Sequence, residues 1–125
     1  MPERVQLSRA KGWRMPPNTV GVARPGKWGN PCKVEGHVDR EYAAAAHVAW
    51  LAGDEIGFDL YGVPPTVAEI REALAGKNLA CWCDHKGHCH ADALLHIANA
   101  PTDDAAQELL RRMFVFGPFS EATTP

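Results

Sequence analysis

The ten residues from 81 to 90 include four candidate metal ligands, which are Cys81, Cys83, Cys89 and His90. Thiolate sulfur and imidazole nitrogen are donors that zinc prefers, and a structural zinc site arranges four of them in a tetrahedron. The ligand types therefore predict a metal site with zinc as the cofactor. The spacing of the cysteines supports a zinc site less strongly than the ligand types do, because zinc knuckles separate paired cysteines by roughly two to four residues. Here a single residue, Trp82, separates Cys81 from Cys83.

The same cluster allows a second interpretation, which is catalysis by a reactive cysteine. Cys89 comes where a helix is expected to begin, and backbone donors and the helix dipole stabilise a thiolate there. A nearby histidine, His85, His88 or His90, would be the general base, and Asp92 would orient it. In this interpretation the catalytic residues are Cys89, His90 and Asp92.

A third interpretation assigns no chemistry to the cluster. Free cysteine is among the most buried residue types, so Cys81 could fill the core while the histidines lie in a solvated loop. The sequence alone leaves these three interpretations open.

Two Gly- and Pro-rich loops, 11–18 and 24–31, carry tryptophans among cations. Arginine and lysine pair with phosphate and an indole stacks on a base, so these loops predict a nucleotide or nucleic-acid partner. The ligand-binding candidates are Lys11, Trp13, Arg14, Lys27, Trp28 and Asn30. The alternative is that each tryptophan covers a small core. Cys32 follows the second loop and is a further candidate for the metal cluster.

The charge distribution favours an anionic partner. Residues 1–33 carry seven Lys/Arg and one Glu, a net charge of +6, whereas residues 34–125 carry a net charge of −8. A basic first third suits an anion, although the two regions could also neutralise each other across the fold.

Helices and strands alternate along the predicted chain. Alternating stretches at 4–8 and 19–23 predict two strands, and the apolar run 79–83 predicts a third, buried one. Helical spacing predicts a helix over 39–51 that begins at Asp39 and stops at Gly53. A capping box formed by Thr66 and Glu69 starts another helix, which runs to about Ala75.

The last two predicted helices follow the cysteine cluster, one over 90–99 and one over about 102–114, and the tail 119–125 is expected to be loose. Residues 54–65 mix Gly, Pro and aromatics without a period and predict no regular element. Side chains two apart on a strand face the same side. We therefore expect Cys81 and Cys83 to point together and Trp82 to point into the opposite layer.

These elements predict an α/β fold, a small three-layer Rossmann-like domain with a short, mainly parallel sheet, whose ligand lies between strand ends and helix starts. A length of 125 residues with 46% apolar and 22% charged residues is typical of one globular domain. The sequence has no apolar run long enough for a membrane span and no secretory signal. We expect a cytoplasmic protein with reduced cysteines and no membrane partner.

Three motifs carry a resemblance to a known family: Lys27-Trp28-Gly29-Asn30-Pro31, Cys81-Trp82-Cys83 and Cys89-His90-Ala91-Asp92. Together they resemble a family of small bacterial and phage proteins described as a domain of unknown function (DUF4326), over about residues 4–99. The resemblance implies that the motifs belong together and implies no activity. The chain differs from the pattern of that family at His85 and His88, so the resemblance assigns these two histidines no role.

The functional expectation is a protein that binds a phosphate-bearing ligand, a nucleotide or nucleic acid, where the basic loops meet the turn from Cys83 to His90, with or without turnover. The alternative is a non-catalytic module in which zinc joins the strand to the following helix and the loops contact nucleic acid or a protein. A third possibility is an interaction protein that binds a partner through Phe114, Phe116 and Phe119.

Overall fold

A three-stranded parallel sheet forms the base of the molecule in the computed structural model, which describes residues 2–24, 26–83 and 89–117. The strands are β1 (Arg4–Gln6), β2 (Thr19–Gly21) and β3 (Asn78–Cys81), and their order in the sheet is β1-β3-β2. β3 is central, because Leu79 pairs with Arg4 on one side and Val20 on the other. The predicted α/β class and parallel sheet are confirmed, although each strand is shorter than its pattern suggested.

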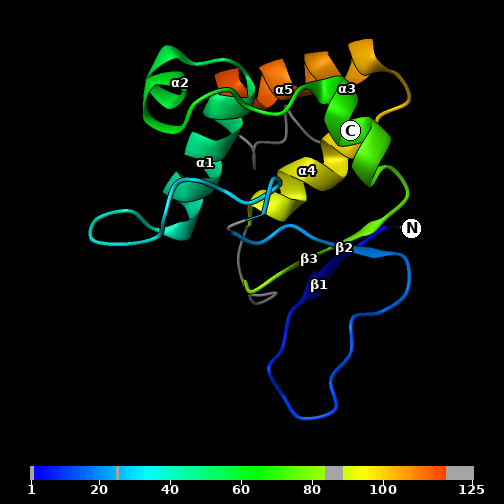
Figure 1. Cartoon of the computed structure of the whole chain (residues 1–125). Coiled ribbons are helices and arrows are strands. Elements are labelled where there is room, and N and C mark those ends of the chain that lie inside the picture. The colour runs from blue at the N-terminus through cyan, green and yellow to red at the C-terminus, as the bar shows by residue number, and fades with distance from the viewer. Residues whose placement is uncertain (1, 25, 84–88, 118–125) are drawn as a thin grey trace.

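Five helices complete the fold. They are α1 (Arg40–Leu51), α2 (Glu55–Tyr61), α3 (Val67–Leu74), α4 (His90–Ala98) and α5 (Asp103–Phe116). α4 packs directly on β3 and β1, while α1, α3 and α5 pack on α4. In Figure 1 all five helices lie on the same side of the sheet. The described helices therefore cover one face of the sheet, and the predicted three-layer Rossmann-like arrangement, with helices on both faces, is not confirmed.

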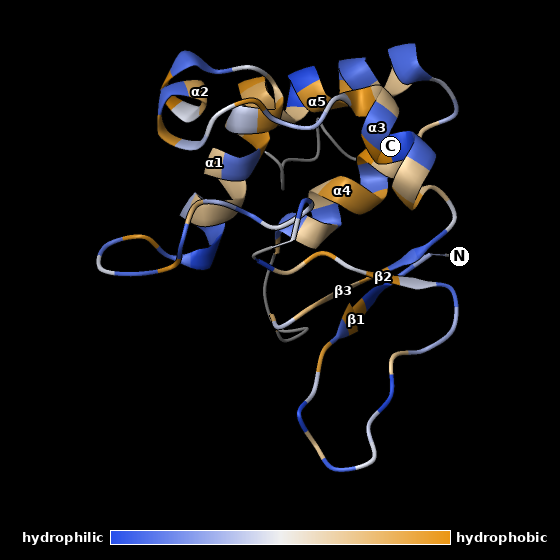
Figure 2. Ribbon diagram, viewed as in Figure 1, coloured by the Kyte–Doolittle hydropathy of each residue, from blue (hydrophilic) through white to orange (hydrophobic). Residues whose placement is uncertain are grey.

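The core lies around α4. Figure 2 shows α4 and β3 as largely hydrophobic, whereas α5 alternates between hydrophobic and hydrophilic turns. One cluster of buried apolar side chains extends from Val22 to Met113 and includes Leu79 and Leu94. The opposite face of the sheet carries the loop between β1 and β2, from which Met15 lies over Gly21. Of the helices in the described part of the chain, none is long and apolar enough to cross a membrane.

The helix starts that the sequence predicted are confirmed by their caps. The Asp39 carboxylate accepts a hydrogen bond from the Tyr42 backbone N–H, and Thr66 and Glu69 form the reciprocal capping box. Gly53 takes a left-handed φ of +93° one residue after the C-cap of α1, which is the conformation expected of a glycine that stops a helix.

The prediction that residues 54–65 form no regular element is wrong, because α2 occupies most of this stretch. Asp54 caps α2 by accepting from the Gly57 N–H. The helix docks through Gly57, where an added Cβ would lie 3.0 Å from Trp50. Its large apolar side chains, Ile56 and Phe58, are exposed. Without a buried apolar stripe, α2 has no helical period that sequence analysis could detect.

Candidate metal centre

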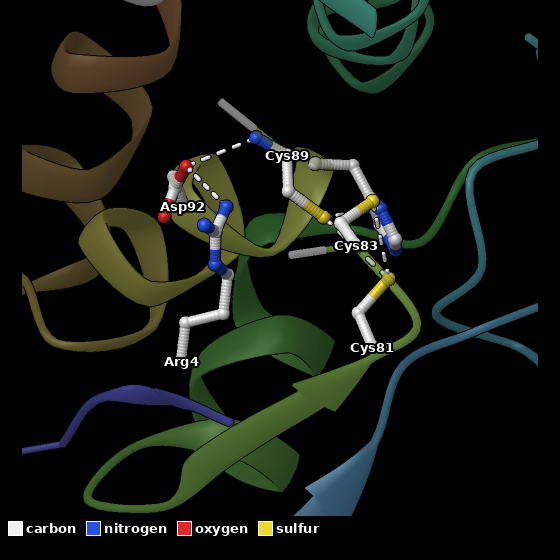
Figure 3. A network of polar contacts seen from close by, with 6 residues as sticks. Arg4, Cys81, Cys83, Cys89 and Asp92 are labelled. Carbon is white, nitrogen blue, oxygen red and sulfur yellow. Dashed lines mark hydrogen bonds and ion pairs between the residues drawn. The ribbon is translucent and has the colours of Figure 1, made fainter. Parts of the chain in front are cut away.

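The three cysteines of the cluster come from the end of β3 and the start of α4. Cys81 is the last residue of β3, Cys83 follows two residues later, and Cys89 is the N-cap of α4. Because α4 packs back onto β3, its first turn lies over the carboxyl end of that strand. Figure 3 shows the three side chains turned toward one another. The predicted common orientation of Cys81 and Cys83 is confirmed.

The distances between the sulfurs fit a tetrahedral metal ion. The Sγ atoms of Cys81 and Cys89 lie 3.5 Å apart, those of Cys81 and Cys83 lie 3.8 Å apart, and all three lie within 4.8 Å of one another. A Zn–S bond of about 2.3 Å at tetrahedral angles separates two sulfurs by about 3.8 Å. The three cysteines could therefore hold a metal ion with little rearrangement.

Asp92 fixes the position of Cys89. One carboxylate oxygen of Asp92 accepts from the backbone N–H of Cys89 at 3.0 Å and from the Arg4 guanidinium at 3.1 Å. The side chain of Arg4 is only 9% exposed, so this ion pair lies at the edge of the core. It joins β1 to the start of α4 (Figure 3). These partners of Asp92 are the Cys89 backbone and Arg4, whereas the sequence interpretation expected Asp92 to orient a histidine.

His90 is buried beside the sulfurs in a defined tautomer. Its Nε2 lies 2.7 Å from the Val22 carbonyl oxygen, which can only accept, so Nε2 carries the proton. The unprotonated Nδ1 then faces the Cys89 Sγ at 3.4 Å. Burial lowers the pKa of His90 and keeps the ring neutral. Of the four predicted metal ligands, His90 alone lies outside the group of mutually close donor atoms.

The three sulfurs contact one another closely enough for their thiols to be coupled. Hydrogen bonds with Cys83 and Cys89 lower the pKa of Cys81, and the hydrogen bonds of Cys89 with its two neighbours raise the pKa of Cys89. Loss of a proton from one thiol of the group therefore depends on the other two.

A second buried histidine, His47 of α1, packs against His90. The two rings meet edge to face with centroids 5.3 Å apart, and the His47 Nδ1 has no hydrogen-bond partner among the residues that the structure describes. Burial lowers the pKa of His47 well below its ordinary value. Sequence analysis did not single out His47. Its spacing from Ala43, Ala44 and Leu51 was the available signal, since these positions share one face of a helix.

The sulfurs line a small cavity of about 140 Å³ that also contains two arginines. Arg24 follows β2 and Arg40 begins α1, so the cavity gathers residues from distant parts of the chain. Cys32 lines the same cavity but lies outside the three-sulfur group. Arg24 belongs to the second basic loop, and neither Arg24 nor Arg40 was predicted to lie at the cysteines. No short-range sequence pattern connects either arginine to the cysteine cluster.

The Trp-Gly-Asn-Pro motif builds a wall of this cavity. Asn30 is buried, with its amide donating to the Ala43 carbonyl and its Oδ1 accepting from the Cys32 N–H. Arg24 donates to the carbonyls of Asn30 and Cys32. A Cβ at Gly29 would lie 2.8 Å from the Arg24 backbone, so glycine permits this close approach. Asn30 therefore holds the loop in place through the hydrogen bonds the structure shows.

The other ligand-binding candidates lie away from the cysteines. Lys27 forms an ion pair with Glu69 at 2.6 Å, and Trp28 is half-buried against the core. These two residues line a different surface hollow beside α3. The three candidates of the first loop, Lys11, Trp13 and Arg14, are not among the described residues that line the cysteine cavity. His85 and His88 lie outside the described residues.

A comparison with known protein families gives one match. The model of a family described as a domain of unknown function (DUF4326) matches residues 5–100, and the chain belongs to that family. No curated protein and no solved structure matches the chain.

Proposed function

We propose that this member of the DUF4326 family binds a zinc ion through Cys81, Cys83 and Cys89, and that the zinc site binds a phosphate-bearing ligand together with Arg24 and Arg40. One observation carries the proposal: the three sulfurs have tetrahedral spacing and line the same cavity as two arginine side chains.

Zinc is the metal that best suits the donor set. Thiolate ligands select zinc among the common divalent ions, and three protein ligands leave one tetrahedral position for a histidine, a water or a ligand oxygen. Cys81 and Cys89 are almost completely buried. Several thiolates held together there would repel one another strongly, and a cation removes that cost.

The cavity is too small for a whole nucleotide. A site that encloses a drug-sized ligand has roughly 300–1,000 Å³, whereas this cavity has about 140 Å³. That volume suits one phosphate group, and arginine is the side chain best matched to phosphate geometry. The rest of the ligand then lies outside. If the ligand is turned over, the unprotonated His90 Nδ1 is the nearest general base.

A second candidate function is a non-catalytic module in which zinc joins β3 to α4. The burial of Cys81 and Cys89 at the junction of these elements favours it, since such a site contributes directly to folding. Its partner would be nucleic acid or a protein. Phe114 and Phe116 of α5 are exposed and suit a protein partner, whereas Phe119 lies outside the described residues.

The first experiment measures the metal content of protein purified without a metal-affinity tag. We expect about one zinc per chain in the wild type and in Cys32→Ala, and almost none in Cys89→Ala, because loss of one of three thiolate ligands removes a large part of the zinc binding free energy. Cys32→Ala is a matched control, since Cys32 is also a buried thiol of the same cavity. Full zinc content in Cys89→Ala would contradict the proposed ligand set.

The second experiment measures inorganic phosphate binding by titration calorimetry. We expect Arg40→Gln to weaken binding about tenfold or more, the effect of losing one charge-assisted hydrogen bond. Lys27→Gln is the control, because Lys27 is a cation that lies outside the cavity. If Lys27→Gln weakens phosphate binding and Arg40→Gln does not, the anion binds near Lys27 and not in the cysteine cavity, which contradicts the proposal.

A further inference from the structure

The ring of Trp82 turns away from the sulfurs, toward the β1–β2 loop (residues 7–18). The Arg9 guanidinium of this loop lies 4.5 Å from the centre of the ring. Cys81 and Cys83, on either side of Trp82 in sequence, turn instead toward Cys89 at the start of α4. In Figure 1 the loop lies on the side of the sheet away from the helices. The layer that Trp82 meets is therefore a loop, and with Arg9 in place the side chain is still 46% exposed.

The cations of the β1–β2 loop have no carboxylate partner among the described residues. Arg9 contacts the Trp82 ring, Lys11 and Arg14 are exposed, and the loop contains no Asp or Glu. Where the helices pack, arginines are paired with carboxylates, as in Arg4–Asp92, Arg71–Asp103 and Arg111–Glu108. The loop thus presents three positive charges that no direct contact neutralises, which suits an anionic partner.

The combination of this charge with an exposed indole favours one kind of polyanion. A single exposed aromatic residue is common on protein surfaces and would carry no argument alone. Single-stranded nucleic acid is recognised by cations that follow its phosphates and by aromatic rings that stack on its bases. A duplex offers the same phosphates, but its paired bases present no free face for stacking.

A membrane surface suits this loop less well. Proteins that lie on a membrane immerse an exposed apolar face in it. The exposed large apolar side chain of this loop is Met15, and it lies over Gly21 of β2. The ring and the cations, without a wider apolar face, match a strand of nucleic acid.

We propose that this side of the sheet binds single-stranded nucleic acid. Trp82 stacks on one base through the part of its ring that Arg9 leaves exposed, and Arg9, Lys11 and Arg14 pair with neighbouring phosphates. The inference goes beyond the proposed function, because it uses neither the zinc ion nor the phosphate cavity. DNA and RNA strands share the groups that it requires.

The first test measures fluorescence anisotropy of a labelled oligothymidylate of about 12 nucleotides, a length typical of one small single-strand site. Trp82→Ala should weaken binding about tenfold, the contribution of one stacked base, and Trp82→Phe should retain most of the affinity. Phe114→Ala is the matched control, because Phe114 of α5 is an aromatic side chain with the same exposed fraction, 46%. It should bind the strand like the wild type.

The second test measures the salt dependence of the same binding. Each phosphate contact contributes about 0.7 to the slope of log affinity against log salt for a single strand. Arg14→Gln should therefore reduce that slope by about 0.7, a change that a purely structural residue would not cause. Lys27→Gln is the control and should leave the slope unchanged, because Lys27 is paired with Glu69 beside α3.

Several results would overturn the inference. They are no binding of either oligothymidylate or oligouridylate, equal binding by Trp82→Ala and the wild type, and a duplex of the same length bound as tightly as the strand. Binding to anionic phospholipid vesicles without binding to a strand would also overturn it. Inorganic phosphate binding should be the same in Trp82→Ala and the wild type, which also shows that the variant is folded. The zinc and phosphate proposal can therefore stand or fail separately.

Discussion

The segments that follow β2 and β3 leave the sheet side by side, and each places a tryptophan near a cation. After β2, Lys27 is paired with Glu69, Trp28 packs on the core, and the Asn30 amide has backbone partners. After β3, Trp82 is exposed and the sulfurs contact mainly one another. Each segment contains a tryptophan, and their contacts distinguish the two segments.

Residues whose types suit catalysis or binding can therefore be fully occupied by contacts that stabilise the fold. The segment after β2 satisfies its polar groups internally and so completes a wall of the cavity. The segment after β3 retains groups that need a further partner, which are the thiols and an aromatic surface. We therefore expect substitutions of Trp28 and Asn30 after β2 to lower stability, and substitutions of the cysteines after β3 to alter metal binding.

The largest effect on stability should come from the ion pair that holds the start of α4. Asp92→Ala removes one ion-pair partner of Arg4 and the acceptor for the Cys89 N–H, and should cost about 3 kcal/mol of unfolding free energy, the sum of a charged hydrogen bond and a helix cap. Urea denaturation measures the loss. Glu108→Ala, which removes exposed ion pairs on α5, is the control and should cause no measurable change. Equal effects of the two substitutions would show that the Arg4–Asp92 pair is not what orders the junction.

The two tryptophans offer the most direct test of the comparison. Trp28→Ala removes a half-buried ring from the core and should lower the unfolding free energy by about 2 kcal/mol. Trp82→Ala removes a largely exposed ring and should change it by less than about 0.5 kcal/mol. Thermal and urea unfolding of both variants check the difference. If Trp82→Ala is the more destabilised variant, Trp82 stabilises the fold more than its exposure predicts.

Local patterns predicted much of the fold and part of the site. Cap residues such as Asp39 and Thr66 marked helix starts because a cap acts within one turn. The two-residue period of a strand placed Cys81 and Cys83 on one side. The cavity arginines, Arg24 and Arg40, could not be assigned to it because tertiary packing alone brings them to the cysteines. The same limit explains why the basic loops were assigned to the site from their composition.

The smallest effect concerns pH and His47, the buried histidine that packs against His90. Its pKa is lowered well below the ordinary value by burial, so the folded protein keeps His47 neutral while the unfolded chain takes up a proton below about pH 6.5. Stability should therefore fall as the pH is lowered, by about 1 kcal/mol between pH 7 and pH 5.5 from this residue. Urea denaturation of the wild type and of His47→Leu at both pH values isolates the contribution. Between pH 7 and pH 5.5, the unfolding free energy of His47→Leu should fall by about 1 kcal/mol less than that of the wild type. An identical pH dependence in the two proteins would mean that His47 is not held neutral in the fold.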